Sequence, residues 1–190
     1  MPDAIFAHPL LAPVYDAFDG DRDDLAAYLA IAGELNARMV LDVGCGTGSL
    51  AIQLAELGHP VVGVDPAEAS LEVARSKDPT GKVRWIRGDA TALPAIGVDL
   101  ATMTGNVAQV FRTDADWVQA LRGIHGALRP GGHLVFETRR PERRAWEAWA
   151  DLNLEGTAFT VNRACTARHS GCEDRFADER WRHHAASTAV

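Results

Sequence analysis

The stretch that decides the fold is Val40-Leu41-Asp42-Val43-Gly44-Cys45-Gly46-Thr47-Gly48-Ser49-Leu50-Ala51. A short apolar run with β-branched residues leads into glycines at three alternate positions, and an apolar helical period starts at Leu50. This pattern predicts a strand, a tight turn and a helix. Because glycine has no Cβ, a ligand can lie against the main chain, and the N–H groups that begin the helix favour a carboxylate or phosphate there.

The spacing of the glycines separates two kinds of cofactor site. The dinucleotide fingerprint has its third glycine or alanine three residues after the second, where this chain has Ser49. The run instead resembles the first motif of the class I S-adenosylmethionine-dependent methyltransferases, an acidic residue followed by Gly-x-Gly-x-Gly, with Asp42 as the acid. The resemblance implies S-adenosylmethionine as the cofactor and covers about residues 1 to 140.

Four more segments have strand character, and helical patterns separate them. The strands are predicted at residues 61–64, 83–86, 98–103 and 133–138. All connections are long enough for right-handed parallel crossovers. We therefore expect an α/β fold, a doubly wound, Rossmann-like and mostly parallel sheet of five recognisable strands with flanking helices. In the helix that begins at Thr113 or Asp114, His125 is expected on the apolar face as a packing residue.

Acidic residues follow two of the predicted strands. Asp65 comes 21 positions after Gly44 (65 − 44 = 21), the separation at which an acid accepts hydrogen bonds from a ribose. It could also cap the helix that follows, with Pro66 at the first helical position. The resemblance implies that Asp89 meets the adenine amine and the N–H of Ala90 a ring nitrogen, and the alternative for Asp89 is an Asx turn.

Other candidate residues come from loops. The loop after the fourth strand holds Thr104 and Asn106, and should border the cofactor's methyl group and the substrate. The first twenty residues suggest a lid or short helical turns, and Tyr15 either lies near the cofactor or packs its ring on the core. The full set of candidate cofactor-binding residues is Asp42, Gly44, Cys45, Gly46, Gly48, Asp65, Pro66, Asp89, Ala90, Thr104, Asn106 and Tyr15. No catalytic residue is assigned, because alignment of nucleophile, methyl and sulfur can supply most of the acceleration.

Composition limits the classes of partner. The net charge of -7 disfavours a partner held by phosphate contacts, and we expect a small-molecule acceptor with no nucleic acid and no membrane. The loop after the fourth strand also lacks the acidic-or-amide, Pro-Pro, aromatic tetrapeptide that is usual where amide or adenine amines are methylated. Three cysteines do not suggest a disulfide framework, which favours a cytoplasmic protein. The oligomeric state is undetermined.

Residues 1–150 are expected to form the cofactor-binding domain, and residues 151–190 a divergent and possibly disordered tail. Leu, Ile, Val and Phe make only six of the last forty residues, too few for the two further strands usual in the family. Either natural divergence or a shifted reading frame would explain such a tail. Its cysteines and histidines match no common zinc spacing, and no metal site is predicted.

Two other functions stay open at this point. One is a protein that keeps the cofactor site but is catalytically impaired without the last strands. The other is an NAD(P)-binding oxidoreductase, which shares the turn and the acid at Asp65.

A disordered tail predicts rapid proteolysis after about Asp151. Limited digestion followed by mass spectrometry should give a stable product that ends near this residue. A full-length chain that resists the protease would contradict the prediction.

Overall fold

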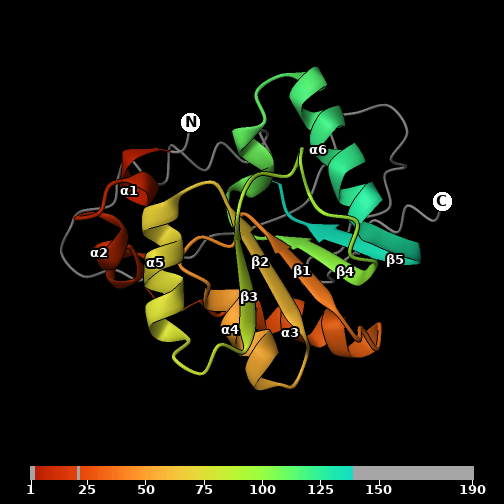
Figure 1. Cartoon of the computed structure of the whole chain (residues 1–190), viewed down its shortest axis with the longest axis horizontal. Coiled ribbons are helices and arrows are strands. Elements are labelled where there is room, and N and C mark those ends of the chain that lie inside the picture. The colour runs from red at the N-terminus through yellow and green to blue at the C-terminus, as the bar shows by residue number, and fades with distance from the viewer. Residues whose placement is uncertain (1–2, 21, 139–190) are drawn as a thin grey trace, which may run out of the picture.

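The computed structural model describes residues 3–20 and 22–138 (Figure 1). All five expected strands are present near the expected residues. The elements in chain order are α1 (Ala4–Ala7), α2 (Ala12–Asp19), α3 (Leu25–Glu34), β1 (Val40–Val43), α4 (Ser49–Glu56), β2 (Val61–Asp65), α5 (Glu68–Lys77), β3 (Val83–Arg87), β4 (Val98–Met103), the 3₁₀ helix η1 (Val107–Val110), α6 (Asp114–Ala127) and β5 (Leu128–Phe136).

The strands form one parallel sheet in the order β3-β2-β1-β4-β5. The chain therefore winds outward from β1 in one direction and then returns to place β4 on the other side. Ligands of open α/β sheets bind at the carboxyl ends of the strands where the order reverses in this way. The doubly wound α/β fold expected from the sequence is confirmed, and its switch point lies between β1 and β4.

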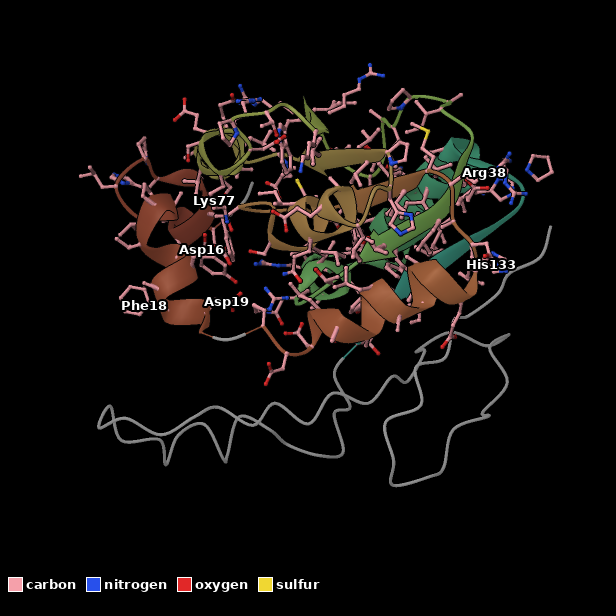
Figure 2. All side chains as sticks on the ribbon, turned by 90° about the horizontal axis from the view of Figure 1, so that it is seen from below. Asp16, Phe18, Asp19, Arg38, Lys77 and His133 are labelled. Carbon is pink, nitrogen blue, oxygen red and sulfur yellow. The ribbon has the colours of Figure 1, made fainter. Side chains whose placement is uncertain are left out.

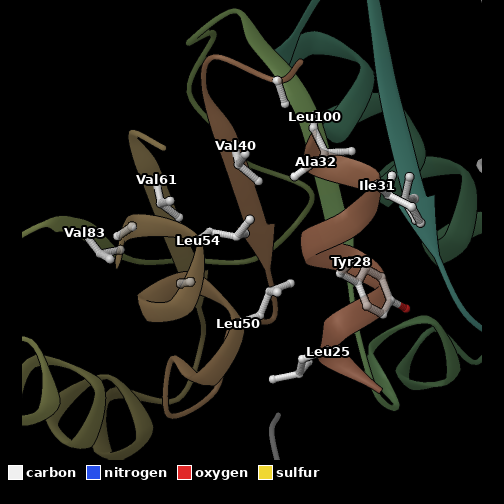
Figure 3. Close-up of a cluster of buried hydrophobic side chains, with 14 residues drawn as sticks. Leu25, Tyr28, Ile31, Ala32, Val40, Leu50, Leu54, Val61, Val83 and Leu100 are labelled. Atoms are coloured by element: carbon white, nitrogen blue, oxygen red, sulfur yellow. The ribbon is translucent and has the colours of Figure 1, made fainter. Parts of the chain in front are cut away.

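The two faces of the sheet have separate apolar cores. Alternate strand residues point to opposite faces, so Val40 packs with α3 and α4 whereas Leu41 packs on the side of α6. Figure 3 shows the first core, in which Leu50 and Leu54 of α4 lie between the helix and the strands. Every residue of β1, β2 and β4 is buried, which explains the wholly apolar strand at residues 61–64.

The buried face of α6 differs from the face expected from the sequence. Ala120, Ile124 and Ala127 are its fully buried residues, whereas His125 is exposed and is not a packing residue. Small residues let α6 lie close to the loop that follows β3. A Cβ on Gly123 would collide with the carbonyl oxygen of Ala90. The loop after β3 can therefore pack against α6 only because this residue has no side chain.

The last strand begins earlier than expected. β5 starts at Leu128, where α6 ends, and its pairing with β4 shifts register between Val98 and Leu100. Gly131 has a φ of 75°, and a Cβ on Gly132 would lie 3.0 Å from the carbonyl oxygen of Val98. The Pro-Gly-Gly sequence therefore makes a bulge inside the strand, where residues 133–138 alone had been expected.

Two sequence-based interpretations lie outside the described residues. The boundary at residue 150 and the tail of residues 151–190, with its cysteines and histidines, fall in the range 139–190. Within residues 3–20 and 22–138, no helix combines the length and apolar character that crossing a bilayer requires.

Two glycines of α6 give a matched test of the packing. Gly123→Ala should destabilise the fold by about 1 to 3 kcal/mol, because its methyl group overlaps the backbone at Ala90. Gly126→Ala meets no atom within 4 Å and should be neutral or stabilising by up to about 1 kcal/mol, since alanine is the better helix former. Urea unfolding of both variants measures the difference, and equal stabilities would contradict this account of α6.

Candidate functional site

The glycine turn between β1 and α4 forms the centre of the site. Gly44, Gly46 and Gly48 have φ values of 70°, 54° and 84°, which side chains other than glycine rarely allow. A Cβ on Gly44 would collide with Val107, and one on Gly48 would lie 2.5 Å from Trp85. At Gly46 nothing lies within 4 Å of that position, so this part of the turn faces open space.

Asp65 at the end of β2 is tied to this turn. Its carboxylate accepts hydrogen bonds from the N–H of Gly46 and from the N–H of Ala67, both at 2.8 Å. Burial raises the pKa of Asp65, while the two N–H bonds oppose that rise. The expected helix cap, with Pro66 at the first helical position, is wrong: α5 begins at Glu68 with Ala67 as its N-cap, and Pro66 precedes the helix. Asp65 instead accepts from the N–H of Ala67 and so fixes the segment that leads into α5. A carboxylate has about four acceptor positions, and these bonds occupy two.

Asp42 lies at the floor of the site with only 1% of its surface exposed. Its Oδ1 accepts a hydrogen bond of 2.9 Å from the hydroxyl of Thr102, and its Oδ2 has no hydrogen-bond partner. Burial raises the pKa of Asp42 to about 7; the Thr102 bond and the charge of Arg22 lower it, and the charge of Asp65 raises it. Burying an oxygen without a hydrogen-bond partner lowers the stability of the fold. A ligand that donates a hydrogen bond to this oxygen would offset that loss.

The segment before α3 lies beside the turn. Asp16 of α2 accepts a 2.5 Å hydrogen bond from the Thr47 hydroxyl and pairs with Lys77 of α5 at 2.6 Å; Figure 2 shows Asp16 and Lys77 next to each other. Tyr15 packs on Phe6 with ring centroids 5.0 Å apart. The expected short helical turns are confirmed as α1 and α2, and the ring of Tyr15 contacts Phe6 of α1 and belongs to neither apolar core.

The loops after β3 and β4 border the same edge. Asp89 is exposed, and its Oδ1 accepts from both the N–H and the hydroxyl of Thr91, so the Asx-turn alternative is present. Asn106 is exposed at the start of η1. The N–H of Gly105 donates to the Oε1 of Glu137 at 2.5 Å, which ties this loop to the end of β5.

The structure brings the predicted residues together in space. At the carboxyl edge of β1 to β4 lie Asp42, Gly44, Cys45, Gly46, Gly48, Asp65, Pro66, Asp89, Ala90, Thr104 and Asn106. Cys45 is buried, and burial raises the pKa of its thiol well above the usual value. This thiol is accordingly unsuited to act as a nucleophile.

Sequence reasoning missed four polar residues of this region: Asp16, Arg22, Thr47 and Glu137. Asp16 and Thr47 are 31 positions apart, and no local pattern signals such a contact. Thr47 could have been found, because it stands inside the glycine turn.

A doubly wound sheet with a glycine turn and two buried acids at its switch point defines a domain that binds a nucleoside-containing cofactor. Residues 40–132 match the methyltransferase domain family. The chain is 34% identical over 118 residues to the cypemycin N-terminal methyltransferase of a Streptomyces species, covering 62% of this chain and 48% of that protein. It is 37% identical over 135 residues to the demethylmenaquinone methyltransferase of Thermus thermophilus, covering 66% and 60%.

Solved structures agree with this assignment. A TehB-like S-adenosylmethionine-dependent methyltransferase from Corynebacterium glutamicum superposes with a TM-score of 0.56 and 30% identity, covering 65% of this chain and 66% of that one. CalS10 of Micromonospora echinaspora, an amino pentose methyltransferase solved with S-adenosylmethionine bound, gives a TM-score of 0.59 and 28% identity, covering 67% and 58%. The chain belongs to the class I S-adenosylmethionine-dependent methyltransferase family, and spans about half the length of the relatives it matches.

The raised pKa of Asp42 predicts a pH-dependent stability. Between its ordinary value of 3.8 and about 7, the folded state keeps a proton that the unfolded state has lost. Stability should therefore fall as the pH rises through this window, by up to about 4 kcal/mol from this group. Asp42→Asn should flatten the dependence, because an amide does not titrate.

Urea unfolding at pH 5 and pH 8 measures this effect. Asp23→Asn is the control, because Asp23 is exposed, and it should keep the wild-type dependence. Equal pH dependence in wild type and Asp42→Asn would show that Asp42 does not hold the proton.

Proposed function

We propose that this chain binds S-adenosylmethionine at the carboxyl edge of its sheet and transfers the methyl group to a small-molecule acceptor. The observation that carries the proposal is the open face of the turn at Gly46, between the buried carboxylates of Asp42 and Asp65. A main chain without a side chain lets a ligand approach closely, and the two acids suit its donors. The names of the relatives support the reaction class.

The ribose and the methionyl ammonium each have a suitable acceptor. Asp65 keeps acceptor capacity beyond its bonds to Gly46 and Ala67, and two ribose hydroxyls are donors that such a carboxylate can hold. The unpartnered Oδ2 of Asp42 suits an ammonium, because a charge-assisted bond would remove the cost of the buried orphan oxygen. These assignments give a ligand donor to both buried carboxylates of the site.

The adenine is assigned to the loop after β3. Both bonds from Thr91 go to the Oδ1 of Asp89, which leaves its Oδ2 to accept from the exocyclic amine. The N–H of Ala90 is the proposed donor to a ring nitrogen. The backbone of this loop packs against α6 at Gly123, and this contact fixes the position of the loop.

The bound cofactor would supply a methyl group on a sulfonium, which is already a reactive electrophile. The chain's own contribution is orientation. Val107 of η1 lies against Gly44 and closes one side of the turn, while Glu137 holds Gly105 and so positions the loop that contains Thr104 and Asn106. These residues would align the acceptor with the methyl group, and such alignment supplies much of the acceleration in a displacement reaction.

The acceptor is proposed to be a small molecule rather than a nucleic acid or a membrane component. The net charge of -7 would repel a phosphate backbone. We also propose that the protein acts in the cytoplasm, where its cysteines would stay reduced.

Asp65→Asn should weaken the binding of S-adenosylhomocysteine by about 1 to 3 kcal/mol, because the amide loses one acceptor and cannot hold both the turn and the ribose. Calorimetric titration of the purified chain measures this loss. Glu56→Gln is the control and should bind as the wild type does, because Glu56 is exposed at the C-terminal end of α4, opposite the helix end that meets the glycine turn. Unchanged affinity in Asp65→Asn would remove Asp65 from the site, and a wild-type chain that binds no S-adenosylhomocysteine would refute the proposed function.

A further inference from the structure

Three aromatic side chains form a cluster at the carboxyl edge of β4 and β5. The ring centroid of Trp117 lies 5.7 Å from that of Phe111 and 5.4 Å from that of Phe136. The rings come from the segment after η1, from α6 and from the end of β5 (Figure 1). Each of the three residues packs on the core beneath it and is half-buried, so part of its surface stays accessible. We call these residues the aromatic cluster.

The aromatic cluster adjoins the glycine turn. Phe136 pairs with Met103, the last residue of β4, so the cluster lies beside the loop that follows this strand. Val107 at the start of η1 lies against Gly44, and Phe111 follows the end of the same short helix. One 3₁₀ helix thus connects the edge of the proposed cofactor site to the aromatic cluster. A molecule bound on the cluster would lie next to the cofactor.

Apolar side chains continue from the cluster onto the surface. Val110 has 65% of its surface exposed and Val118 has 40%, and these residues are the sequence neighbours of Phe111 and Trp117. Covering apolar surface with an apolar ligand is favourable in proportion to the area removed from water. This edge of the site therefore suits an apolar molecule.

The start of α6 holds Trp117 in place. The N–H of Asp116 donates to the hydroxyl oxygen of Thr113 at 3.1 Å, and the N–H of Trp117 donates to the carbonyl oxygen of Thr113 at 3.0 Å. This N-cap orders the helical turn that carries the indole. Little conformational entropy would then be lost when a ligand binds there.

We infer that the aromatic cluster binds the methyl acceptor, and that this acceptor carries a planar aromatic ring. The inference rests on the proposed function and names the class of its small molecule. The planes of the two ring pairs meet at 53° and 62°, so a further ring can join them in the offset or edge-to-face arrangement that aromatic pairs prefer. A sugar or a charged peptide fits less well, because its polar groups would lose water without gaining hydrogen-bond partners on these rings.

A purely structural role for the aromatic cluster makes a different prediction. If the rings only cover the end of the core, replacing Trp117 should lower the melting temperature and leave the preference among ligands unchanged. If the rings bind the acceptor, the replacement should remove a preference for aromatic over saturated ligands.

The test compares β-naphthol with its saturated analogue decahydro-β-naphthol, on the full chain saturated with S-adenosylhomocysteine. Calorimetric titration of the wild type should show that β-naphthol binds at least about threefold more tightly, because ring–ring contacts add to the apolar area buried. Trp117→Leu should bind both alcohols alike, and its affinity for S-adenosylhomocysteine reports whether the cofactor site is intact. Phe18→Leu is the matched control and should keep the preference, because Phe18 is an exposed aromatic residue of α2 (Figure 2).

NMR gives a second measurement that needs no folded variant. The indole N–H of Trp117 should shift when β-naphthol is added to the chain saturated with S-adenosylhomocysteine. The indole N–H of Trp85, which packs against Gly48 beneath the turn, should stay in place.

The outcomes separate the inference from the proposed function. A wild type that binds S-adenosylhomocysteine but shows no preference for β-naphthol, or no shift at Trp117, would overturn the inference alone. So would a Trp117→Leu variant that keeps the preference, or a Phe18→Leu variant that loses it. A wild type that does not bind S-adenosylhomocysteine would overturn the proposed function as well. If Trp117→Leu does not fold, Phe111→Leu replaces it and should reduce the preference at least about twofold; an unreduced preference would overturn the inference.

Discussion

The rest of the structure depends on a backbone constraint at the glycine turn. Three residues with positive φ values reverse the chain between β1 and α4, and side chains at Gly44 and Gly48 would collide with Val107 and Trp85. The chain's own packing thus explains two of the three glycines. Gly46 faces open space; its positive φ favours glycine there, and the proposed cofactor would approach the main chain at this point.

Two buried acids connect this turn to the sheet. Asp65 holds Gly46 through a backbone bond, and Asp42 keeps an oxygen without a partner beneath it. Burial raises the pKa of both carboxyl groups, so both destabilise the free fold at neutral pH. Proteins keep such costly groups mainly at functional sites. Ligand donors at Asp42 and Asp65 would recover part of this cost, which links the burial of the two carboxylates to the proposed use of the site.

The sequence predicted the sheet well because three of its strands, β1, β2 and β4, are wholly buried and mostly apolar, and glycines or an acid mark the ends of β1, β2 and β3. The sequence did not predict the features that depend on contacts between residues far apart in the chain. His125 seemed to continue an apolar stripe, but small residues such as Ala120 set the buried face of α6. The early start of β5 depends on a bulge against β4. No periodic pattern in the sequence indicates the hydrogen bond between Asp16 and Thr47 or the contacts of Arg22 with Asp19 and Asp24. Asp42, Asp65 and the glycines, by contrast, belong to recognisable local motifs.

The central claim is that the cofactor lies against the main chain at Gly46. Amide chemical shifts of the isotope-labelled chain, followed by NMR during titration with S-adenosylhomocysteine, test it directly. The account predicts large shifts at Gly46 and at Ala67, whose N–H groups share the Asp65 carboxylate, and small shifts at Gly58 and Gly97 in the loops that precede β2 and β4. Shifts that spare Gly46, or that gather at the opposite edge of the sheet, would contradict it.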